Sequence, residues 1–291
     1  MKRSLTLLMA FAIVLASCGG GADGGATDPT DVPTTTLTPR TTTSTPDRNP
    51  DEVVLQVRTE GGFMPIEFAY NTLPRYTLLA DGRLLFEGPV PAIFPGPLML
   101  SVQVAQLPDG EVARILELVE AAGLPLIEDE TNTEYTNTVA DAPDTVVTYF
   151  DENGRHRFSV YALGIGLDPQ SDPRVAGLQR VVEALDTAAF SGAPVEEWSA
   201  SSLQVIATDS FGGESEPDAT VVPWPLAETV AESGAEVFAG LLCVALEGDD
   251  LTAAEPAFAA ANQLTFFDDG AATYRLTVRP VLPGDAACPA G

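Results

Sequence analysis

Residues 145–163, TVVTYFDENGRHRFSVYAL, carry the clearest fold signal in the chain. Two runs rich in β-branched and aromatic residues flank Asn153-Gly154, a pair that suits the two positive-φ positions of a type I′ turn. The stretch therefore predicts a β-hairpin with this pair at its tip. Two further stretches have the same design, RYTLLADGRLLFEG around Asp81-Gly82 and QLTFFDDGAATYRLTVRP around Asp269-Gly270.

Between these hairpins lie stretches with helical periodicity and recognisable ends. In LPDGEVARILELVEAAGLP, Asp109 is a candidate N-cap, and Gly123 followed closely by proline ends the helix. In SDPRVAGLQRVVEALDTA, Asp172 is expected to cap the helix and Pro173 to take its first position. A third helix is predicted near 252–262, where a capping-box pattern opens a short apolar run.

Strands joined by tight turns and interrupted by helices favour an α+β fold. We expect antiparallel, hairpin-rich sheets with a few packed helices, and not a doubly wound parallel sheet. SGAPVEEWSAS follows a finished helix and lacks apolar periodicity, so two small α+β domains are predicted, at 51–198 and 199–291. Further strands are predicted at 52–58, 98–106, 202–208 and 240–246.

The N-terminus has the pattern of a secretory signal peptide over residues 1–17. Lys2 and Arg3 precede an apolar run at 7–15, which is too short to span a bilayer of about 30 Å as a helix. The ending LASC resembles the lipobox of bacterial lipoproteins. That resemblance implies cleavage before Cys18, a diacylglycerol on its thiol, and a protein anchored by lipid to the cell membrane and facing outside. The alternative is a plain signal peptide with a chance cysteine.

Residues 18–50 join the lipidated cysteine to the folded part. The segment is dominated by Gly, Thr, Pro and Asp, so it has almost nothing to bury and is predicted to be a disordered tether. As a flexible coil, its roughly 32 residues would hold the folded part about 30 Å from the lipid.

The charge of the chain restricts its partners and its chemistry. There are 42 acidic and 14 basic residues, for a net charge of −28. Such a surface repels nucleic acid and anionic lipid, so neither is an expected partner. Solubility in a salty habitat or an acidic binding face would each account for the charge. Lys2 is the only lysine, which excludes Schiff-base, Walker-type and Ser-x-x-Lys chemistry, and no cofactor is expected.

Two cysteines remain once Cys18 is assigned to the lipid. In an oxidising compartment, Cys243 and Cys288 most simply pair with each other. Closing a loop of about 46 residues would stabilise the fold by about 4 kcal/mol in the chain-entropy model. The predicted disulfide would fasten the Gly- and Pro-rich C-terminal tail to the second domain.

His156 is the only imidazole in the chain, so any histidine-based catalysis must use it. The hairpin places Asp151 beside His156. This pair is either half of a catalytic triad or a structural contact, in which an aspartate of the turn satisfies a histidine at the rim of the apolar face. No Gly-x-Ser-x-Gly motif supplies a nucleophile. The acidic clusters at 128–130 and Asp249-Asp250 lack the pattern of a dedicated calcium loop, and no metal site is expected.

The proline-rich run FEGPVPAIFPGPLML, residues 86–100, is apolar yet unable to form a helix or a central strand. It is expected either to lie over the sheet as a cover for the core or to present Val90, Ile93 and Phe94 to a partner. Trp224, between prolines in VVPWPL, poses the same alternative.

Several features together resemble uncharacterised lipoproteins of high-GC Gram-positive bacteria (actinobacteria). They are the lipobox, the Thr/Pro/Gly tether, the TEGGF start, the DGRLLFEGP hairpin and the RPVLPGDAAC ending. The resemblance lends no activity. The leading hypothesis is a non-catalytic binding or scaffolding module at the cell envelope with an unknown ligand. The alternative is a secreted, carboxylate-dependent hydrolase acting on sugar polymers.

Overall fold

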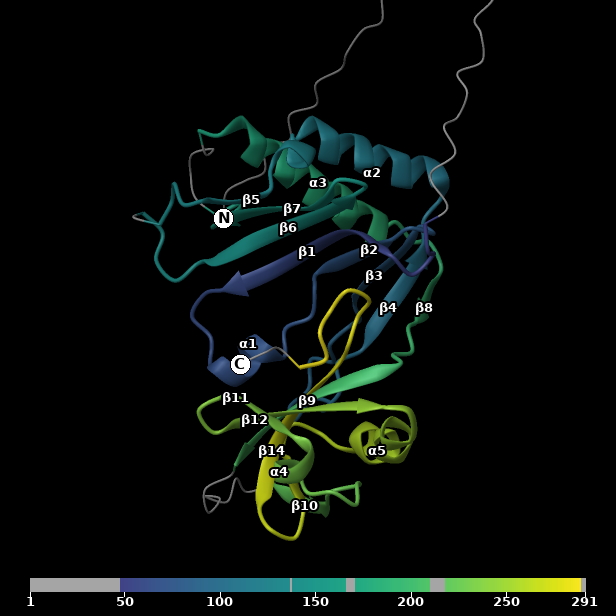
Figure 1. Ribbon diagram of the computed structural model, residues 1–291, viewed down its shortest axis with the longest axis vertical. Coiled ribbons are helices and arrows are strands. Elements are labelled where there is room, and N and C mark those ends of the chain that lie inside the picture. Colours follow the sequence, from purple (N-terminus) through teal and green to yellow (C-terminus); the bar gives the residue numbers. More distant parts are fainter. Residues whose placement is uncertain (1–47, 137, 166–170, 210–217, 289–291) are drawn as a thin grey trace, which may run out of the picture. The chain divides into compact units, whose positions relative to one another are not determined.

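The computed structural model describes residues 48–136, 138–165, 171–209 and 218–288. The predicted signal peptide, Cys18 and nearly all of the tether lie outside these residues. The described part forms five α-helices, one 3-10 helix and 14 strands in two mixed sheets (Figure 1), which confirms the α+β class. None of the helices described is long and apolar enough to cross a membrane.

The first sheet has the order β5-β7-β6-β1-β2-β3-β4-β8. Its neighbouring strands are antiparallel except for the edge strand β5, which runs parallel to β7. Sequence reasoning predicted the hairpins β2–β3 and β6–β7 but not the parallel edge. The strands are β1 (Val53–Gly61), β2 (Tyr76–Leu79), β3 (Arg83–Glu87), β4 (Val102–Gln106), β5 (Asp129–Asn132), β6 (Pro143–Asp151), β7 (Gly154–Tyr161) and β8 (Val195–Glu197).

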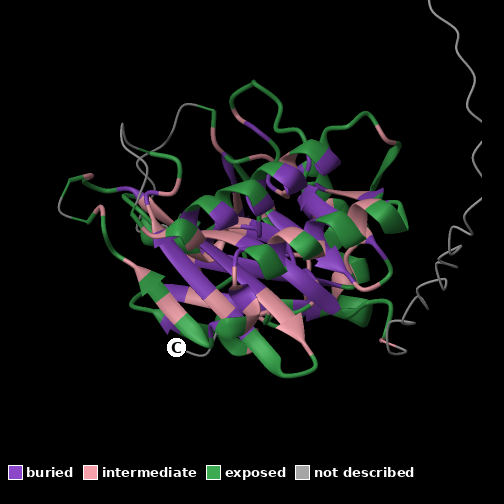
Figure 2. Ribbon diagram, turned by 90° about the horizontal axis from the view of Figure 1, so that it is seen from above, coloured by how far each residue is buried: buried purple, intermediate pink, exposed green. Residues whose placement is uncertain are grey.

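Helices α2 (Asp109–Ala121) and α3 (Pro173–Ala189) cover one face of this sheet, with their buried sides turned toward it (Figure 2). The 3-10 helix η1 (Leu124–Leu126) follows α2. As predicted, Asp172 caps α3, because its carboxylate accepts a hydrogen bond from the Arg174 N–H at 2.9 Å. The N-cap of α2 is Pro108 and not Asp109, which lies one residue later, in the first turn.

The second sheet has the order β10-β13-β14-β9-β12-β11 and is antiparallel except for β10 beside β13. Helix α5 (Gly248–Ala260) packs on it through the fully buried Phe258. The remaining elements are α1 (Ile66–Tyr70), α4 (Val230–Ser233), β9 (Ser202–Asp209), β10 (Thr220–Pro223), β11 (Ala235–Phe238), β12 (Leu241–Glu247), β13 (Thr265–Asp268) and β14 (Thr273–Pro280).

The predicted start of α5 is wrong by four residues. The helix begins at Gly248, and the hydroxyl of Thr252 donates to the Gly248 carbonyl at 3.0 Å instead of capping the helix. Pro256 lies inside the helix, where its ring removes one backbone hydrogen bond. Burial of Phe258 and Ala254 in the core of the second sheet offsets that cost.

The three predicted hairpins form, but their turns differ from the prediction. In β6–β7, Asp151 pairs with Gly154, so Glu152 and Asn153 form the tip. The reason is local, because the Asp151 carboxylate accepts the backbone N–H groups of Asn153 and Gly154, at 2.7 and 3.1 Å. In the other two hairpins, the glycines Gly82 and Gly270 still supply the positive φ.

The strands of each sheet come from one of the two segments predicted as domains. The strands of the first sheet fall between residues 53 and 197, and those of the second between 202 and 280. The chain then returns, because Leu282 packs against Val53, Leu79 and Leu85 of the first sheet. The division at 198/199 into independent domains stays a prediction.

Candidate functional site

The face of the first sheet that carries no helix is polar over strands β1, β6 and β7. Residues two apart on a strand share a face, and the register places Gln56 beside Thr148, and Thr148 beside Arg157. Arg58 and Arg155 lie on the same face by this alternation. Three arginine side chains therefore project from one face of the sheet, from strands β1 and β7 on either side of β6.

Strand β14 of the second sheet contributes a buried arginine, Arg279, and strand β9 contributes Gln204 beside it. Only 7% of the Arg279 side chain is exposed. Its guanidinium donates to Gln204 Oε1 at 2.8 Å, to the Tyr70 carbonyl at 3.3 Å and to the Pro280 carbonyl at 3.4 Å. Burial lowers the pKa of Arg279, and the nearby carboxylate of Asp285 opposes that shift.

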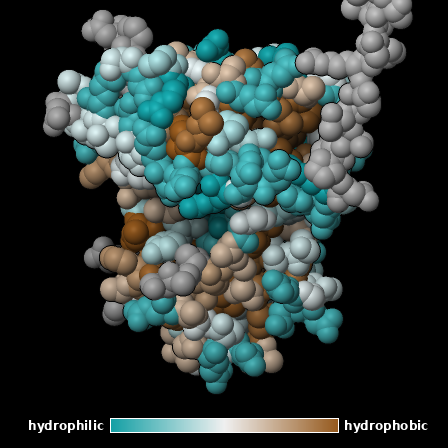
Figure 3. Space-filling model, turned by 45° about the horizontal axis from the view of Figure 1, so that its top comes forward, coloured by the Kyte–Doolittle hydropathy of each residue, from teal (hydrophilic) through white to brown (hydrophobic). Residues whose placement is uncertain are grey.

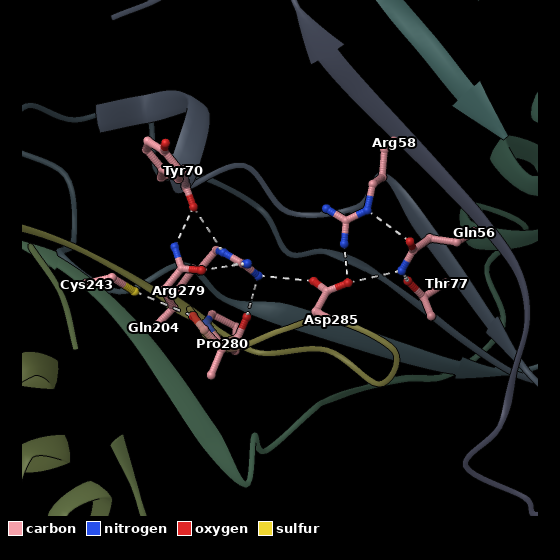
Figure 4. A network of polar contacts seen from close by, with 10 residues as sticks. Gln56, Arg58, Tyr70, Thr77, Gln204, Cys243, Arg279, Pro280 and Asp285 are labelled. Carbon is pink, nitrogen blue, oxygen red and sulfur yellow. Dashed lines mark hydrogen bonds and ion pairs between the residues drawn. The ribbon is translucent and has the colours of Figure 1, made fainter. Parts of the chain in front are cut away.

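Asp285 joins the two sheets from the loop that follows β14 (Figure 4). Its side chain is only 2% exposed and accepts from Arg279 at 3.2 Å through one oxygen. The other oxygen accepts from Arg58 and, at 3.4 Å, from Gln56 Nε2. One carboxylate is thus shared by guanidiniums from both sheets, and the yellow loop that carries it lies between the sheets in Figure 1.

The predicted disulfide between Cys243 and Cys288 is present. The two Cα atoms are 5.9 Å apart, within the expected range. The bond connects β12 to the chain three residues after Asp285. It therefore fixes the loop that supplies the shared carboxylate.

A pocket of about 490 Å³ opens beside this network. Arg155 and Arg157 line it and are paired with Asp129 of β5, at 3.3 and 3.1 Å, and Arg157 also contacts Glu60 at 3.1 Å. The wall includes four arginines and two carboxylates. The lining residues are Gln56, Arg58, Glu60, Ala69, Tyr70, Thr72, Val146, Thr148, Phe150, Arg155, Arg157, Gln204, Arg279, Gly284, Asp285 and Ala286.

A second pocket, also of about 490 Å³, lies beside β3 and α3. Asp186 accepts hydrogen bonds there from Tyr76 Oη and, at 2.7 Å, from Arg75. Burial, with the hydrogen bond to Asp186, raises the pKa of Tyr76 to about 12. Glu87 is exposed overall, yet partial burial removes water from its carboxyl and raises its pKa. Phe190, which is 73% exposed, completes the wall.

His156 lies on the helix-covered face with Phe158 and Val160. Its Nε2 lies 3.0 Å from Asp151 Oδ1, and its Nδ1 lies 2.7 Å from the Ile127 carbonyl. Both partners are acceptors, so both contacts are hydrogen bonds when the ring is protonated, and they favour the imidazolium form. The hydrogen bond to Asp151 chiefly raises the pKa of His156. With both nitrogens engaged, the arrangement fits the structural alternative and leaves no nitrogen to act as a base.

The proline-rich run divides into a buried and an exposed part. Leu98 packs in the core of the second sheet, and its N–H donates to the Ala261 carbonyl at 3.2 Å. Val90, Ile93 and Phe94 are 66, 70 and 76% exposed, so this part does not cover the core. Figure 3 shows apolar side chains reaching the surface in separate places among hydrophilic ones.

Trp224 does not belong to an exposed patch. It is 6% exposed and packs with Phe258 and Phe267, at centroid distances of 6.0 and 6.4 Å. Its Nε1 donates to the Glu228 carbonyl at 2.9 Å, which satisfies the indole inside the core. Of the two alternatives left open for Trp224, packing on the core against α5 is the one observed, and presentation to a partner is not.

The acidic clusters considered for calcium have structural roles. Asp129 pairs with arginines of β7, and Glu130 makes a bidentate pair with Arg174 at 2.8 and 2.6 Å. Asp249 and Asp250 occupy the first turn of α5, where negative charge favours the helix. Across the described residues, no group of three or more His, Cys, Asp or Glu side chains could hold a metal ion.

Sequence reasoning missed the arginine-lined pocket. One signal was available, because Arg155 and Arg157 alternate along a predicted strand, in a chain with few basic residues. The contribution of Arg279 and Asp285 was not visible, since only the tertiary fold brings the C-terminal loop to the first sheet. Comparison of the chain with protein-family models, with curated proteins and with solved structures finds no match.

Proposed function

We propose that this chain is a lipid-anchored, extracytoplasmic protein whose folded part binds a ligand in the arginine-lined pocket. The proposal joins the lipobox-like ending at Cys18 and the tether that follows it with a pocket of a size that suits a small molecule. The anchor holds the protein at the outer face of the cell membrane. The partners are the membrane lipid and an envelope or extracellular ligand, and nucleic acid is not among them.

The observation that carries the proposal is that both carboxylates lining the pocket are paired with arginines. Asp285 is buried and shared by Arg58 and Arg279, and Glu60 is paired with Arg157. A general acid or a nucleophile needs a carboxylate that can reach its substrate. Asp285 is out of reach of a substrate, and Glu60, although 46% exposed, is held by Arg157. The pocket wall therefore offers mainly guanidinium donors, which is an arrangement for binding.

Native mass spectrometry tests this function directly. The purified chain is incubated with small molecules extracted from the envelope and medium, and the retained masses are recorded. Ala69 is exposed and lines the pocket, so Ala69→Trp fills the site without disturbing the core. We expect a retained compound with the native chain and none with Ala69→Trp. The matched control is Ala113→Trp on the exposed side of α2, which should retain it. Equal retention by Ala69→Trp would contradict the proposal.

The second candidate function is a carboxylate-dependent hydrolase at the pocket beside β3 and α3. The observation that favours it is Glu87, whose raised pKa suits a general acid, in one pocket with the carboxylate of Asp186. Glu87→Gln and Asp186→Asn should each reduce hydrolysis of a dye-labelled polysaccharide at least about 100-fold, whereas Glu117→Gln on the exposed side of α2 should not. Absence of hydrolysis by the native chain would remove this candidate.

A further inference from the structure

We infer that the ligand of the arginine-lined pocket is a small organic oxyanion that carries a carboxylate or a phosphate group. The inference rests on the proposed binding function and specifies its chemistry. The juxtaposition that carries it is the placement of Arg58, Arg155 and Arg157 on one sheet face, opposite the buried Arg279 of the other sheet.

The charge balance of the pocket is the reverse of that of the whole chain. Four guanidiniums line the wall against the carboxylates of Glu60 and Asp285. Asp129 does not line the pocket but adds a third carboxylate through its ion pairs with two of the arginines. One positive charge remains in excess. Asp144, farther along β6, accepts from Ser159 and does not line the pocket. An anion entering the pocket meets this local excess in a protein of net charge −28.

The spacing of the arginines suits convergence on one group. Arg155 and Arg157 are two residues apart on a strand, about 7 Å. Arg58 lies two strands away and level with Ser159, so its Cα is about 12 Å from that of Arg157 and about 17 Å from that of Arg155. Arginine side chains are long enough to close these distances. A guanidinium binds carboxylate or phosphate through two parallel N–H groups, which lysine cannot reproduce.

Arg155 has the greatest free donor capacity. Its side chain is 57% exposed, and within the described residues it makes a single hydrogen bond, from Nη2 to Asp129 Oδ2 at 3.3 Å. A guanidinium has five N–H donors, so most of those of Arg155 face the pocket or solvent. Arg58, 25% exposed, uses its Nε and one terminal nitrogen.

Asp285 is an example, within the protein, of a carboxylate bound by arginines of this network. Its carboxylate lies between two guanidiniums from different sheets and receives an amide donor as well. A ligand carboxylate or phosphate beside Arg155 and Arg157 would repeat this arrangement at the open end of the pocket. The acidic groups elsewhere on the protein repel an anion in the pocket only weakly, because exposed charges more than about 8 Å apart are largely screened at physiological ionic strength.

Isothermal titration calorimetry with inorganic phosphate and with succinate tests the inference, at constant ionic strength maintained with sodium chloride. Erythritol is the neutral control. We expect at least one of the two anions to bind the full chain and erythritol not to bind. The anion that binds identifies phosphate or carboxylate as the favoured group. Arg155→Gln should weaken binding at least about tenfold, and Arg155→Lys should restore part of it, because the charge returns without the planar fork.

The control variant is Arg114→Gln, whose side chain pairs with Glu111 on the helix-covered side, and it should bind as the native chain does. Arg155 is largely exposed, so its loss should leave the circular dichroism spectrum unchanged, which separates lost binding from lost folding. Binding of neither anion, or equal binding by Arg155→Gln, would overturn the inference. If the native chain still retains a neutral compound that Ala69→Trp releases, the binding function stands and only the anionic chemistry is wrong.

Discussion

Replacing Asp285 with asparagine removes the charge that two arginines share while keeping nearly the same shape. The Asp285 side chain is 2% exposed and that of Arg279 is 7% exposed, so neither charge can turn to water. At the observed 3.2 Å, an effective dielectric constant of about 20 gives an attraction of about 5 kcal/mol. Loss of one partner of a buried ion pair costs about 3–5 kcal/mol. We therefore expect Asp285→Asn to lower the free energy of unfolding by about 3–5 kcal/mol.

A double-mutant cycle distinguishes the ion pair from a general packing defect. Arg279→Met alone leaves the buried carboxylate with one fewer guanidinium, and combining it with Asp285→Leu replaces the pair with apolar groups. The double variant should be destabilised by less than the sum of Arg279→Met and Asp285→Leu, with a difference of at least about 2 kcal/mol.

The assay is urea denaturation followed by far-ultraviolet circular dichroism and tryptophan fluorescence. The two tryptophans report different places, since Trp224 lies in the core of the second sheet and Trp198 packs against the helix-free face of the first. Glu152→Gln at the exposed hairpin tip is the control and should change stability by no more than about 0.5 kcal/mol. A loss below about 1 kcal/mol for Asp285→Asn, or strict additivity in the cycle, would refute the reasoning.

Three further predictions concern other parts of the chain. Replacing Cys243 and Cys288 with serine should cost about 4 kcal/mol of unfolding free energy, because the bond closes a sequence separation of 45 residues; a loss under about 1 kcal/mol in urea denaturation would show that the loop holds without it. His156→Gln should reduce stability most in acid: the hydrogen bond to Asp151 raises the pKa of the imidazole, so its contribution is fully present below about pH 6.5 and disappears as pH rises through the raised value. The difference from the native chain should shrink between about pH 5.5 and pH 9, and a pH-independent difference would contradict this role. Cys18→Ser should move the protein from the membrane to the soluble fraction or leave the signal peptide uncut, and unchanged membrane retention on fractionation would reject the lipid anchor.

The candidate site was only partly predictable. The disulfide followed from counting cysteines in an exported chain, and the Asp151–His156 contact followed from the proximity of the two residues across one turn. The Arg279–Asp285 pair could not be predicted, because short-range patterns do not show which sheet face a returning C-terminal loop will meet. The same limit applies to Trp224, whose burial depends on packing against α5.

The sequence by itself determined the features that depend on neighbouring residues. These are the three hairpins, the capped start of α3 at Asp172 and Pro173, and the α+β class. Each arises from backbone preferences and side-chain periodicity within about 20 residues. Only the tertiary structure decided the parallel edge strands β5 and β10 and the arginine-lined pocket. These features depend on long-range pairing and on the desolvation of charged groups, whose energies are set by partners far away in the chain.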